Sequence, residues 1–334
     1  CCTSPPSGSR TPSVTHGAIA SPTRCAICST STEPALVGMQ LRAATRGSAL
    51  ALWQTRHVAS LLECEIDEVV VSTVGDRNTD VPIHSMGGKG VFVKEVQAAV
   101  LDGRADFAVH SGKDLPAVTP DGLVLVCVPA RADARDALVG ASWASLSPGA
   151  HIATGSVRRR AQLAWHRPDL VFSELRGNIQ TRLEKLESGG FDGIVMAAAA
   201  IDRLALDLSI PVDRLDPAIM LPQVAQGALA IECRADDTET IAVLRAIQHA
   251  DTRRVVDTER AFLHELGGDC DLPAGAHATL GDDGIEITGM LASLDGRVLI
   301  RERRVGTDPD QLGRAVARFL LDERGGRDLL ADLR

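Results

Sequence analysis

The sequence predicts an α/β protein with two parallel-sheet units, followed by a smaller α+β module. Apolar runs of strand length alternate with segments of helical periodicity from Leu41 to about residue 128, and the alternation restarts near Ala150. This alternation is typical of parallel sheets whose strands are connected by helices. Beyond residue 275, short strands follow one another without intervening helices, which indicates hairpins and a separate module.

The first unit is expected to begin with a strand over residues 41–45. A helix follows, which the Ser48 hydroxyl can cap and which ends near Leu62. The remaining elements of this unit are, in order, a Val-rich strand over 68–73, a loop over 75–90, a helix over 91–101, and strands over 105–110 and 123–128.

The second unit repeats this arrangement. Its expected elements are a strand over 151–154, a helix over 157–165, a strand over 170–175, a helix over 178–187 and a strand over 193–197. A strand over 228–233 and two helices within 236–262 lead to the last module. That module is expected to have strands over 276–279, 285–291 and 298–305 and a helix over 309–321.

Composition excludes several classes of partner. The net charge of -9 argues against a broad basic face for nucleic acid or anionic lipid, and aromatic residues, at 3%, offer few stacking platforms. No apolar run reaches the roughly 18 residues of a membrane span. The 8 Cys are scattered, as is typical of reduced thiols. We therefore expect a cytoplasmic protein with a small-molecule partner.

Residues 1–39 are predicted to be a disordered N-terminal extension, because Ser, Thr, Pro and Gly dominate and no apolar periodicity is present. Met39 could be a start of translation. Cys25 and Cys28 have half of a zinc-type spacing, but stray thiols in a flexible extension are the favoured interpretation.

Polar and basic residues gather where predicted strands meet the segments that follow them. Ligands of open α/β sheets bind beyond the carboxyl ends of the strands, where helix N-termini and Arg side chains can hold anions. One such Arg would more often be a solvated surface charge, but recurrence predicts a cleft for several carboxylates. The junctions are Thr45-Arg46-Gly47-Ser48, His110-Ser111-Gly112-Lys113-Asp114, Thr154-Gly155-Ser156-Val157-Arg158-Arg159 and Arg176-Gly177-Asn178.

Asp114 is unusual in such a cleft, because a carboxylate among cations weakens the binding of an anionic substrate. It is useful if positive charge develops on the substrate during the reaction, since a fixed carboxylate would stabilise that charge. The alternative is an Asp that only offsets a helix dipole. The neighbouring cations favour the catalytic interpretation.

These motifs resemble the porphobilinogen deaminase, or hydroxymethylbilane synthase, family. The resemblance covers about residues 40–334 in the family's order. It is carried by the runs Leu41–Arg46, Leu50-Ala51-Leu52-Trp53-Gln54, Gly87-Gly88-Lys89-Gly90-Val91-Phe92, His110 to Pro116, Val157-Arg158-Arg159, Leu175-Arg176-Gly177-Asn178 with Thr181-Arg182, and Leu221-Pro222 through Gln226-Gly227-Ala228.

The resemblance implies a transferase of haem (tetrapyrrole) biosynthesis. Four porphobilinogen molecules lose ammonia and join head to tail into the linear tetrapyrrole hydroxymethylbilane. Loss of ammonia leaves an electron-poor azafulvene that is cationic when protonated, which suits Asp114 as the catalytic carboxylate. The family also implies a monomer that needs no metal.

The resemblance further implies a dipyrromethane cofactor held by a Cys thioether. Cys270 has the family's offset from Pro273 and Gly275 and is the expected attachment residue. By matched position, the cofactor-binding residues are Lys113, Ser111, Thr154, Ser156, Arg158, Arg159 and Arg182, and the substrate-binding residues are Arg46, Ser48, Lys89, Arg176 and Gln226. Gln226 is expected near a domain crossing.

The family's fold has two domains with parallel or mixed sheets, like the halves of a periplasmic-type binding protein, joined by two crossings, and a third, smaller α+β domain. Mapped onto this sequence, domain 1 takes residues 40–130 and 228–248, domain 2 takes 131–227, and domain 3 takes 249–334 with the attachment cysteine.

Several motif residues depart from the family pattern. They are Ala49, Gly112, Ala153, Gly155, Ala225 and Asp269. Gly112, in place of Met, is expected to loosen the segment that carries Asp114, and Ala225 replaces a Gly. Asp269 adds negative charge beside Cys270. We expect an active enzyme that is slower than its relatives.

A rival hypothesis is a non-catalytic anion-binding protein of the same two-lobed fold. It would explain the arginines but neither Asp114 nor Cys270.

Overall fold

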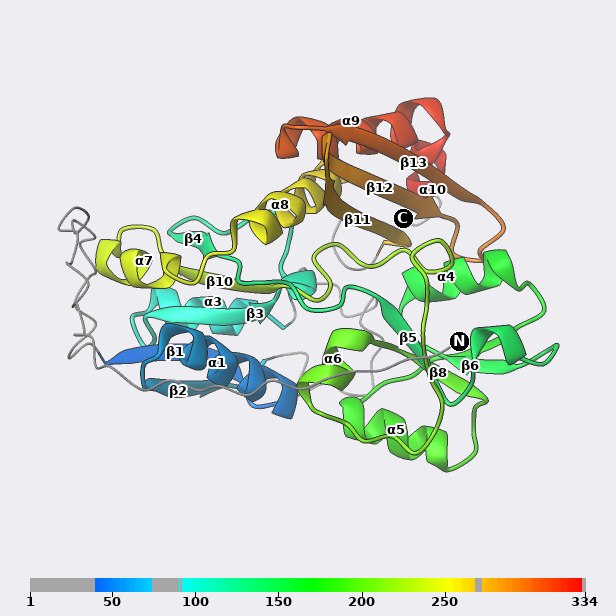
Figure 1. Cartoon of the computed structure of the whole chain (residues 1–334), viewed down its shortest axis with the longest axis horizontal. Helices are drawn as coiled ribbons and strands as arrows, with labels where there is room; N and C mark the ends of the chain where they lie inside the picture. Colours follow the sequence, from blue (N-terminus) through cyan, green and yellow to red (C-terminus); the bar gives the residue numbers. More distant parts are fainter. Residues whose placement is uncertain (1–39, 74–89, 91, 268–271, 332–334) are drawn as a thin grey trace, which may run out of the picture. The chain divides into compact units, whose positions relative to one another are not determined.

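The computed structural model describes residues 40–73, 90, 92–267 and 272–331. The described strands form two 5-stranded sheets and one 3-stranded sheet (Figure 1), which confirms the α/β class with an additional small module. The predicted N-terminal extension and nearly all of the 75–90 loop lie outside the described residues.

The first sheet contains mostly elements that the sequence predicts. Its strands are, in order across the sheet, β2 (Ile66–Val71), β1 (Leu41–Arg46), β3 (Phe107–Ser111), β10 (Leu229–Arg234) and β4 (Leu123–Cys127). Strand β1 is parallel to β2 and β3, whereas β10 is antiparallel to both of its neighbours. Its helices are α1 (Ala49–Leu62), α3 (Lys94–Leu101) and α7 (Thr238–Arg245).

The second sheet has the same arrangement. Its strands are, in order, β7 (Val171–Ser173), β6 (His151–Ala153), β8 (Gly193–Ala197), β5 (Asp136–Val139) and β9 (Val212–Arg214). Strand β5 is antiparallel to β8 and β9, as β10 is in the first sheet. The accompanying helices are α4 (Val157–His166), α5 (Ile179–Glu187) and α6 (Ala198–Arg203).

Each of these two sheets is mixed, which confirms the expected fold class of two domains with parallel or mixed sheets. Two consecutive strands of one sheet that are connected by a helix run parallel. A strand that enters from another sheet has no such helical connection, so its direction does not follow from the alternation. Strands β5 and β9, of 4 and 3 residues, were not predicted. Some boundaries also differ: for example, β2 begins two positions earlier than expected, and α3 begins at Lys94.

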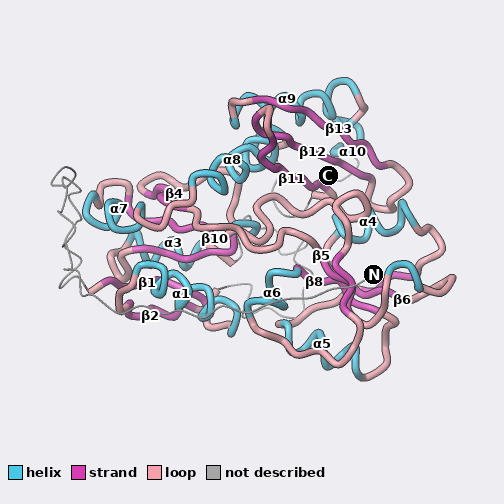
Figure 2. Tube along the Cα trace, viewed as in Figure 1, coloured by secondary structure: helices cyan, strands magenta, loops and turns pink. Residues whose placement is uncertain are grey.

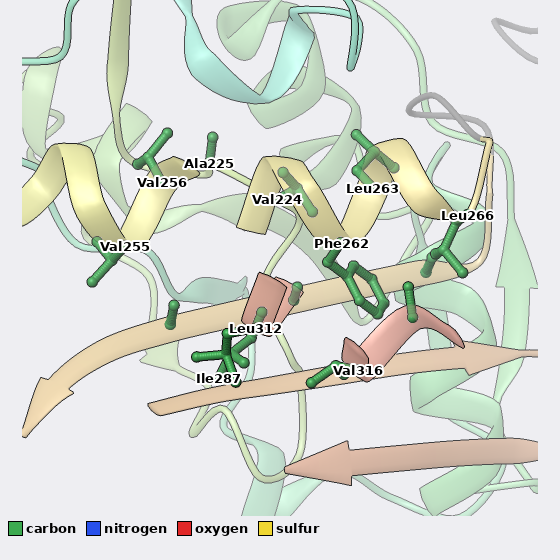
Figure 3. Packing of buried hydrophobic residues seen from close by; sticks show 14 of the residues in the cluster. Val224, Ala225, Val255, Val256, Phe262, Leu263, Leu266, Ile287, Leu312 and Val316 are labelled. Atoms are coloured by element: carbon green, nitrogen blue, oxygen red, sulfur yellow. The ribbon is translucent and has the colours of Figure 1, made fainter. Parts of the chain in front are cut away.

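The third sheet is antiparallel and contains β11 (Ala274–Gly281), β12 (Gly284–Ala292) and β13 (Leu299–Gly306). Helices α8 (Ala250–Glu265), α9 (Pro309–Glu323) and α10 (Gly326–Ala331) accompany it. Phe262 points from α8 into a core with Ile287 and Val316 (Figure 3), and all three are 0% exposed. A Cβ at Gly289 would lie 2.5 Å from the Phe262 ring, so only glycine fits beneath it.

The chain passes twice between the first two sheets, once from β4 to β5 and once from β9 to β10. Both crossings consist of loop (Figure 2), and the yellow strand β10 lies among the cyan strands in Figure 1. The expected domain division is at 130/131, 227/228 and 248/249. Those boundaries themselves stay a prediction.

The two crossing segments contact each other. The Ala132 N–H donates to the Gly227 carbonyl at 3.1 Å, and Arg131 Nε donates to the Gln226 carbonyl at 2.9 Å. Gly227 has φ +85°, and a Cβ there would lie 2.6 Å from the Ala132 carbonyl oxygen. Glycine is therefore required where the crossings meet.

Candidate active site

A pocket lies at the carboxyl ends of β1 and β3. Four predicted site residues line it together: Arg46, Ser48, Ser111 and Asp114. The parallel pairing of β1 with β3 explains this, because both strands end at the same edge of the sheet.

The polar side chains of this pocket are fixed by neighbouring elements. The Ser48 hydroxyl caps α1 by accepting from the Ala51 N–H at 3.3 Å. Ser111 Oγ accepts a hydrogen bond of 2.9 Å from Gln54 Nε2, and the Arg46 guanidinium lies 4.3 Å from the centre of the Phe92 ring. Gln54 was not predicted as a site residue, although a glutamine on the buried face of an apolar helix is a detectable signal.

Asp114 lies on a short 3-10 turn, Gly112–Asp114, and not at the start of an α-helix. The expected helix N-terminus at this junction is therefore absent. The reason is Pro116, which disfavours helical geometry at Leu115, where ψ is 134°. Asp114 consequently faces no helix dipole, which removes the alternative explanation for this carboxylate.

The other junctions do begin α-helices. Ser156 Oγ caps α4 by accepting from the Arg159 N–H at 3.5 Å, and Asn178 Oδ1 caps α5 by accepting from the Thr181 N–H at 2.9 Å. The buried Thr154 hydroxyl accepts from the Ser156 N–H at 3.2 Å. These caps leave other first-turn N–H groups available to an anion.

Arg158 and Arg159 converge on Asp136, a fully buried residue that sequence reasoning missed. Arg158 Nη2 lies 2.8 Å from Asp136 Oδ2, and Arg159 Nη2 lies 2.7 Å from Oδ1. Arg158 also donates to the Leu221 carbonyl, and Arg159 to the Val195 carbonyl. Much of the hydrogen-bonding capacity of both arginines is therefore used inside the protein.

Gln226 belongs to the same cluster and lies in the crossing that leads to β10. Its Nε2 donates to the Ala134 carbonyl at 2.8 Å and to Asp136 Oδ1 at 3.0 Å, and its Oε1 accepts from Lys113 Nζ at 3.4 Å. Gln226 thus connects Lys113, which precedes Asp114, with the arginine cluster.

The charges of this cluster perturb one another. Burial alone would raise the pKa of Asp136, but the charges of Arg158, Arg159 and Lys113 bring it below its ordinary value. Burial, with repulsion from Arg159 and Arg158, lowers the pKa of Lys113 to about 8. Burial, with repulsion from Arg159 and Arg176, lowers the pKa of Arg182 to about 10 although Asp114 opposes the shift.

The cations of this region outnumber its carboxylates. Among the described residues, the buried Arg158 Nε and Arg176 Nη2 also lack a hydrogen-bond acceptor. Unpaired buried donors in a cationic cluster cost free energy unless an acceptor binds there. The residues therefore fit a ligand that carries several carboxylates.

Two predicted site residues, Lys89 and Cys270, lie outside the described residues, as does Asp269. Leu272 and Ala274, which follow Cys270 in the sequence, line a second pocket together with Lys113 and Arg158. No group of His, Cys, Asp or Glu that could hold a metal ion is found in the part of the chain that the structure describes. None of the described helices is both long and apolar enough to cross a membrane.

Residues 41–242 match the family model described as "Porphobilinogen deaminase, dipyromethane cofactor binding domain", and residues 254–322 match "Porphobilinogen deaminase, C-terminal domain". The chain belongs to the porphobilinogen deaminase family. The porphobilinogen deaminase of Brevibacillus brevis is 46% identical over 86% of this chain and 96% of its own length. That of Syntrophotalea carbinolica is 45% identical over 88% of this chain and 96% of its own length.

The VFT2 domain of Bordetella pertussis BvgS is a solved structure with weak similarity to this chain. It matches 66% of this chain and 92% of its own length at 12% identity, with a TM-score of 0.39.

Proposed function

We propose that this chain is a hydroxymethylbilane synthase, a transferase that condenses four porphobilinogen molecules head to tail with loss of ammonia. Family membership supports the reaction. The observation that carries the mechanism is a carboxylate, Asp114, that shares its pocket with Arg46 and lies within electrostatic reach of Lys113 and Arg182.

In this proposal Asp114 acts on charge that develops during deamination. Loss of ammonia from porphobilinogen leaves a cationic fragment, and a fixed carboxylate beside its pyrrole N–H stabilises that charge and accepts or returns the proton. The surrounding cations bind the acetate and propionate groups of the substrate.

The substrate-binding residues are proposed to be Arg46, Ser48, Lys89 and Arg176. Gln226 is proposed to act indirectly. Its side chain is 0% exposed and bonded to Lys113 and Asp136, so it orients these two groups and does not reach the substrate.

The dipyrromethane cofactor is proposed to be attached to Cys270. Its carboxylates would be held by Lys113, Arg158, Arg159 and Arg182 and by the hydroxyl groups of Thr154 and Ser156 at the start of α4, with Ser111 at the first pocket. When bound, the cofactor supplies the nucleophilic pyrrole carbon on which the chain grows. The unpaired donors of Arg158 and Arg176 support an anionic occupant.

The test replaces Asp114 with Asn, which removes the charge and keeps the size. We expect Asp114→Asn to lower kcat by about 10³-fold, the size typical of lost electrostatic and proton-transfer catalysis. Porphobilinogen consumption and the intact mass of the protein are the measurements. A Cys270→Ser variant, expected to lack the added mass of two pyrrole units, is the control for the cofactor.

The rival function, a non-catalytic anion-binding protein, makes the opposite prediction. It requires an unmodified mass for the purified chain and no turnover of porphobilinogen, whatever stands at position 114. Full activity of Asp114→Asn in protein that carries the cofactor would refute the proposed role of Asp114 without refuting the reaction. We further propose that the enzyme is a cytoplasmic monomer. Native mass spectrometry tests the oligomeric state.

A further inference from the structure

Residues 110–117, here called the Asp114 segment, are held at both ends by buried charged groups. At the first end, His110 is 5% exposed, and its Nε2 lies 3.1 Å from Glu232 Oε2. At the other end, Arg260 of α8 donates from Nη2 to the Pro116 and Ala117 carbonyls at 3.1 and 3.2 Å. The segment between these contacts carries Lys113 and Asp114.

Glu232 occupies the centre of this arrangement. It lies on β10, where Ala230 pairs with His110 and Glu232 pairs with Ala108, so Glu232 and His110 share one face of the sheet. Glu232 is 0% exposed, and its Oε2 also accepts from Gln97 Nε2 at 2.8 Å. Strands β3 and β10 and helix α3 therefore meet at this carboxylate.

The charge of Glu232 reaches both ends of the segment. Burial alone would raise the pKa of Glu232, but the hydrogen bond and charge of His110, the hydrogen bond of Gln97 and the charge of Arg260 lower it below its ordinary value. Burial lowers the pKa of Arg260, and Glu232 opposes that shift. Glu232 is thus ionised at neutral pH, and its charge attracts that of Arg260.

Stability alone does not account for this carboxylate. A buried ion costs several kcal/mol of desolvation, and an apolar residue at such a position is often neutral or stabilising. Glu232 Oε1, moreover, is buried without a hydrogen-bond donor among the described residues. The arrangement instead fixes the one stretch of chain that carries the proposed catalytic carboxylate.

We propose that Glu232 is a positioning residue, which holds the Asp114 segment in register with the pocket through His110 at one end and Arg260 at the other. This rests on the proposed function of Asp114. Because Arg260 belongs to α8, which ends shortly before Cys270 in the sequence, the same contact ties the Asp114 segment to the helix that leads to the proposed attachment cysteine.

The test compares Glu232→Gln with Asp106→Asn. Asp106 directly precedes β3, is partly buried and accepts from Arg42 Nη2 at 2.7 Å, so its amide variant removes a more exposed ion pair at the opposite end of the same strand. We expect Glu232→Gln to lower kcat by about 10²-fold, as small misplacement of a catalytic group does, with KM changed less than about threefold. Asp106→Asn should leave both parameters unchanged.

A second measurement does not depend on activity. The Gly112 N–H donates to the Ala228 carbonyl at 2.9 Å and the Leu115 N–H to the Gly112 carbonyl at 3.3 Å, so both amides report on the segment. Hydrogen exchange of a peptide covering 110–118 should be faster in Glu232→Gln and in Arg260→Gln than in Asp106→Asn. If the wild-type chain fails to consume porphobilinogen, the proposed function fails, and the exchange result still decides the positioning role.

The double variant Glu232→Gln/Arg260→Gln completes the experiment. If Glu232 and Arg260 act on the segment together, the fold-loss of kcat in the double variant is smaller than the product of the fold-losses in the two single variants. The proposal is overturned if exchange of the peptide is unchanged in Glu232→Gln, or if the loss of kcat only follows a loss of folded, cofactor-carrying protein.

Discussion

Two residues that depart from the family pattern, Gly112 and Ala225, contact each other. A Cβ built at Gly112 would lie 3.1 Å from Ala225 Cβ and 3.2 Å from the Ala225 carbonyl oxygen. The resemblance implies Met and Gly at these two positions, and we infer that the Ala225 methyl group takes up part of the space that a side chain at position 112 would fill. Gly112 is closely packed, contrary to the expectation of a looser Asp114 segment.

This exchange has a conformational cost at Ala225, whose φ is +56°. Left-handed geometry costs an alanine about 1 kcal/mol relative to glycine. We expect Gly112→Ala to lower the free energy of unfolding by about 1–3 kcal/mol through overpacking, and by less in an Ala225→Gly background. Chemical denaturation of the singles and the double measures this coupling, and strictly additive effects would show that the two positions are independent.

Lys113 gives the ligand-free protein a pH-dependent stability. Its pKa is about 8 in the folded chain against an ordinary 10.5, so between these values the unfolded state binds more protons and stability rises with pH. Both proteins are compared in a Cys270→Ser background. As pH increases from 8 to 10, the free energy of unfolding of the protein with Lys113 should therefore rise relative to that of the Lys113→Met variant. Urea unfolding at several pH values tests this, and a constant difference would contradict it.

At the level of the element, three of the four predicted junctions use one device. A polar side chain caps the helix through one N–H, while a basic residue stands beside the first turn. Capping and anion binding are most clearly separate at the start of α5, because the Asn178 side chain caps the helix and Arg176 is the proposed anion ligand. The helix start thus has a structural component and a binding component.

Variants of Asn178 are expected to separate the two. Asn178→Ala should lower the free energy of unfolding by about 1 kcal/mol and change KM little, because only the cap is lost. Asn178→Asp should retain the cap and the stability but raise KM, since a carboxylate then competes for the nearby cations. Thermal denaturation and steady-state kinetics measure these effects. Equal KM values for the two variants would argue against an anion site here.

At the scale of the whole molecule, one buried ion pair joins the crossings to the third sheet. Arg131 Nη1 lies 2.7 Å from Glu259 Oε1, and Glu259 also accepts from the Ala225 and Ala278 N–H groups at 2.7 and 2.8 Å. Glu259 is 0% exposed. Helix α8 is therefore fixed to both crossing segments by a single carboxylate.

Glu259→Gln should lower the free energy of unfolding by about 3–5 kcal/mol, because it leaves the buried Arg131 charge uncompensated. Asp257→Asn is a matched control on the same helix. Its partner Arg253 is 2.8 Å away but both side chains are about one-third exposed, so a loss below about 1 kcal/mol is expected. Similar denaturation midpoints for the two variants would refute the importance of the buried pair.

Local pattern in the sequence was sufficient for much of the fold. Alternating apolar runs predicted most strands of the first two sheets and most of the helices between them, although not α6, and hairpin-length strands predicted the third sheet. Ser48 was recognisable as a cap from its place before an apolar helical segment, whereas the caps Ser156 and Asn178 were found only in the structure. The position of Asp114 among cations at a strand end was likewise readable, because residue type and strand order are local information.

Only the tertiary structure decided strand direction and the partners of buried charges. Strands β5 and β10 run antiparallel because they arrive from the neighbouring sheet, which no periodicity records. Asp136 and Glu232 are far in sequence from Arg158 and His110, and nothing local distinguishes them from solvated carboxylates. Their environment exists only once the sheets have formed, since desolvation and ion pairing depend on residues that folding brings together.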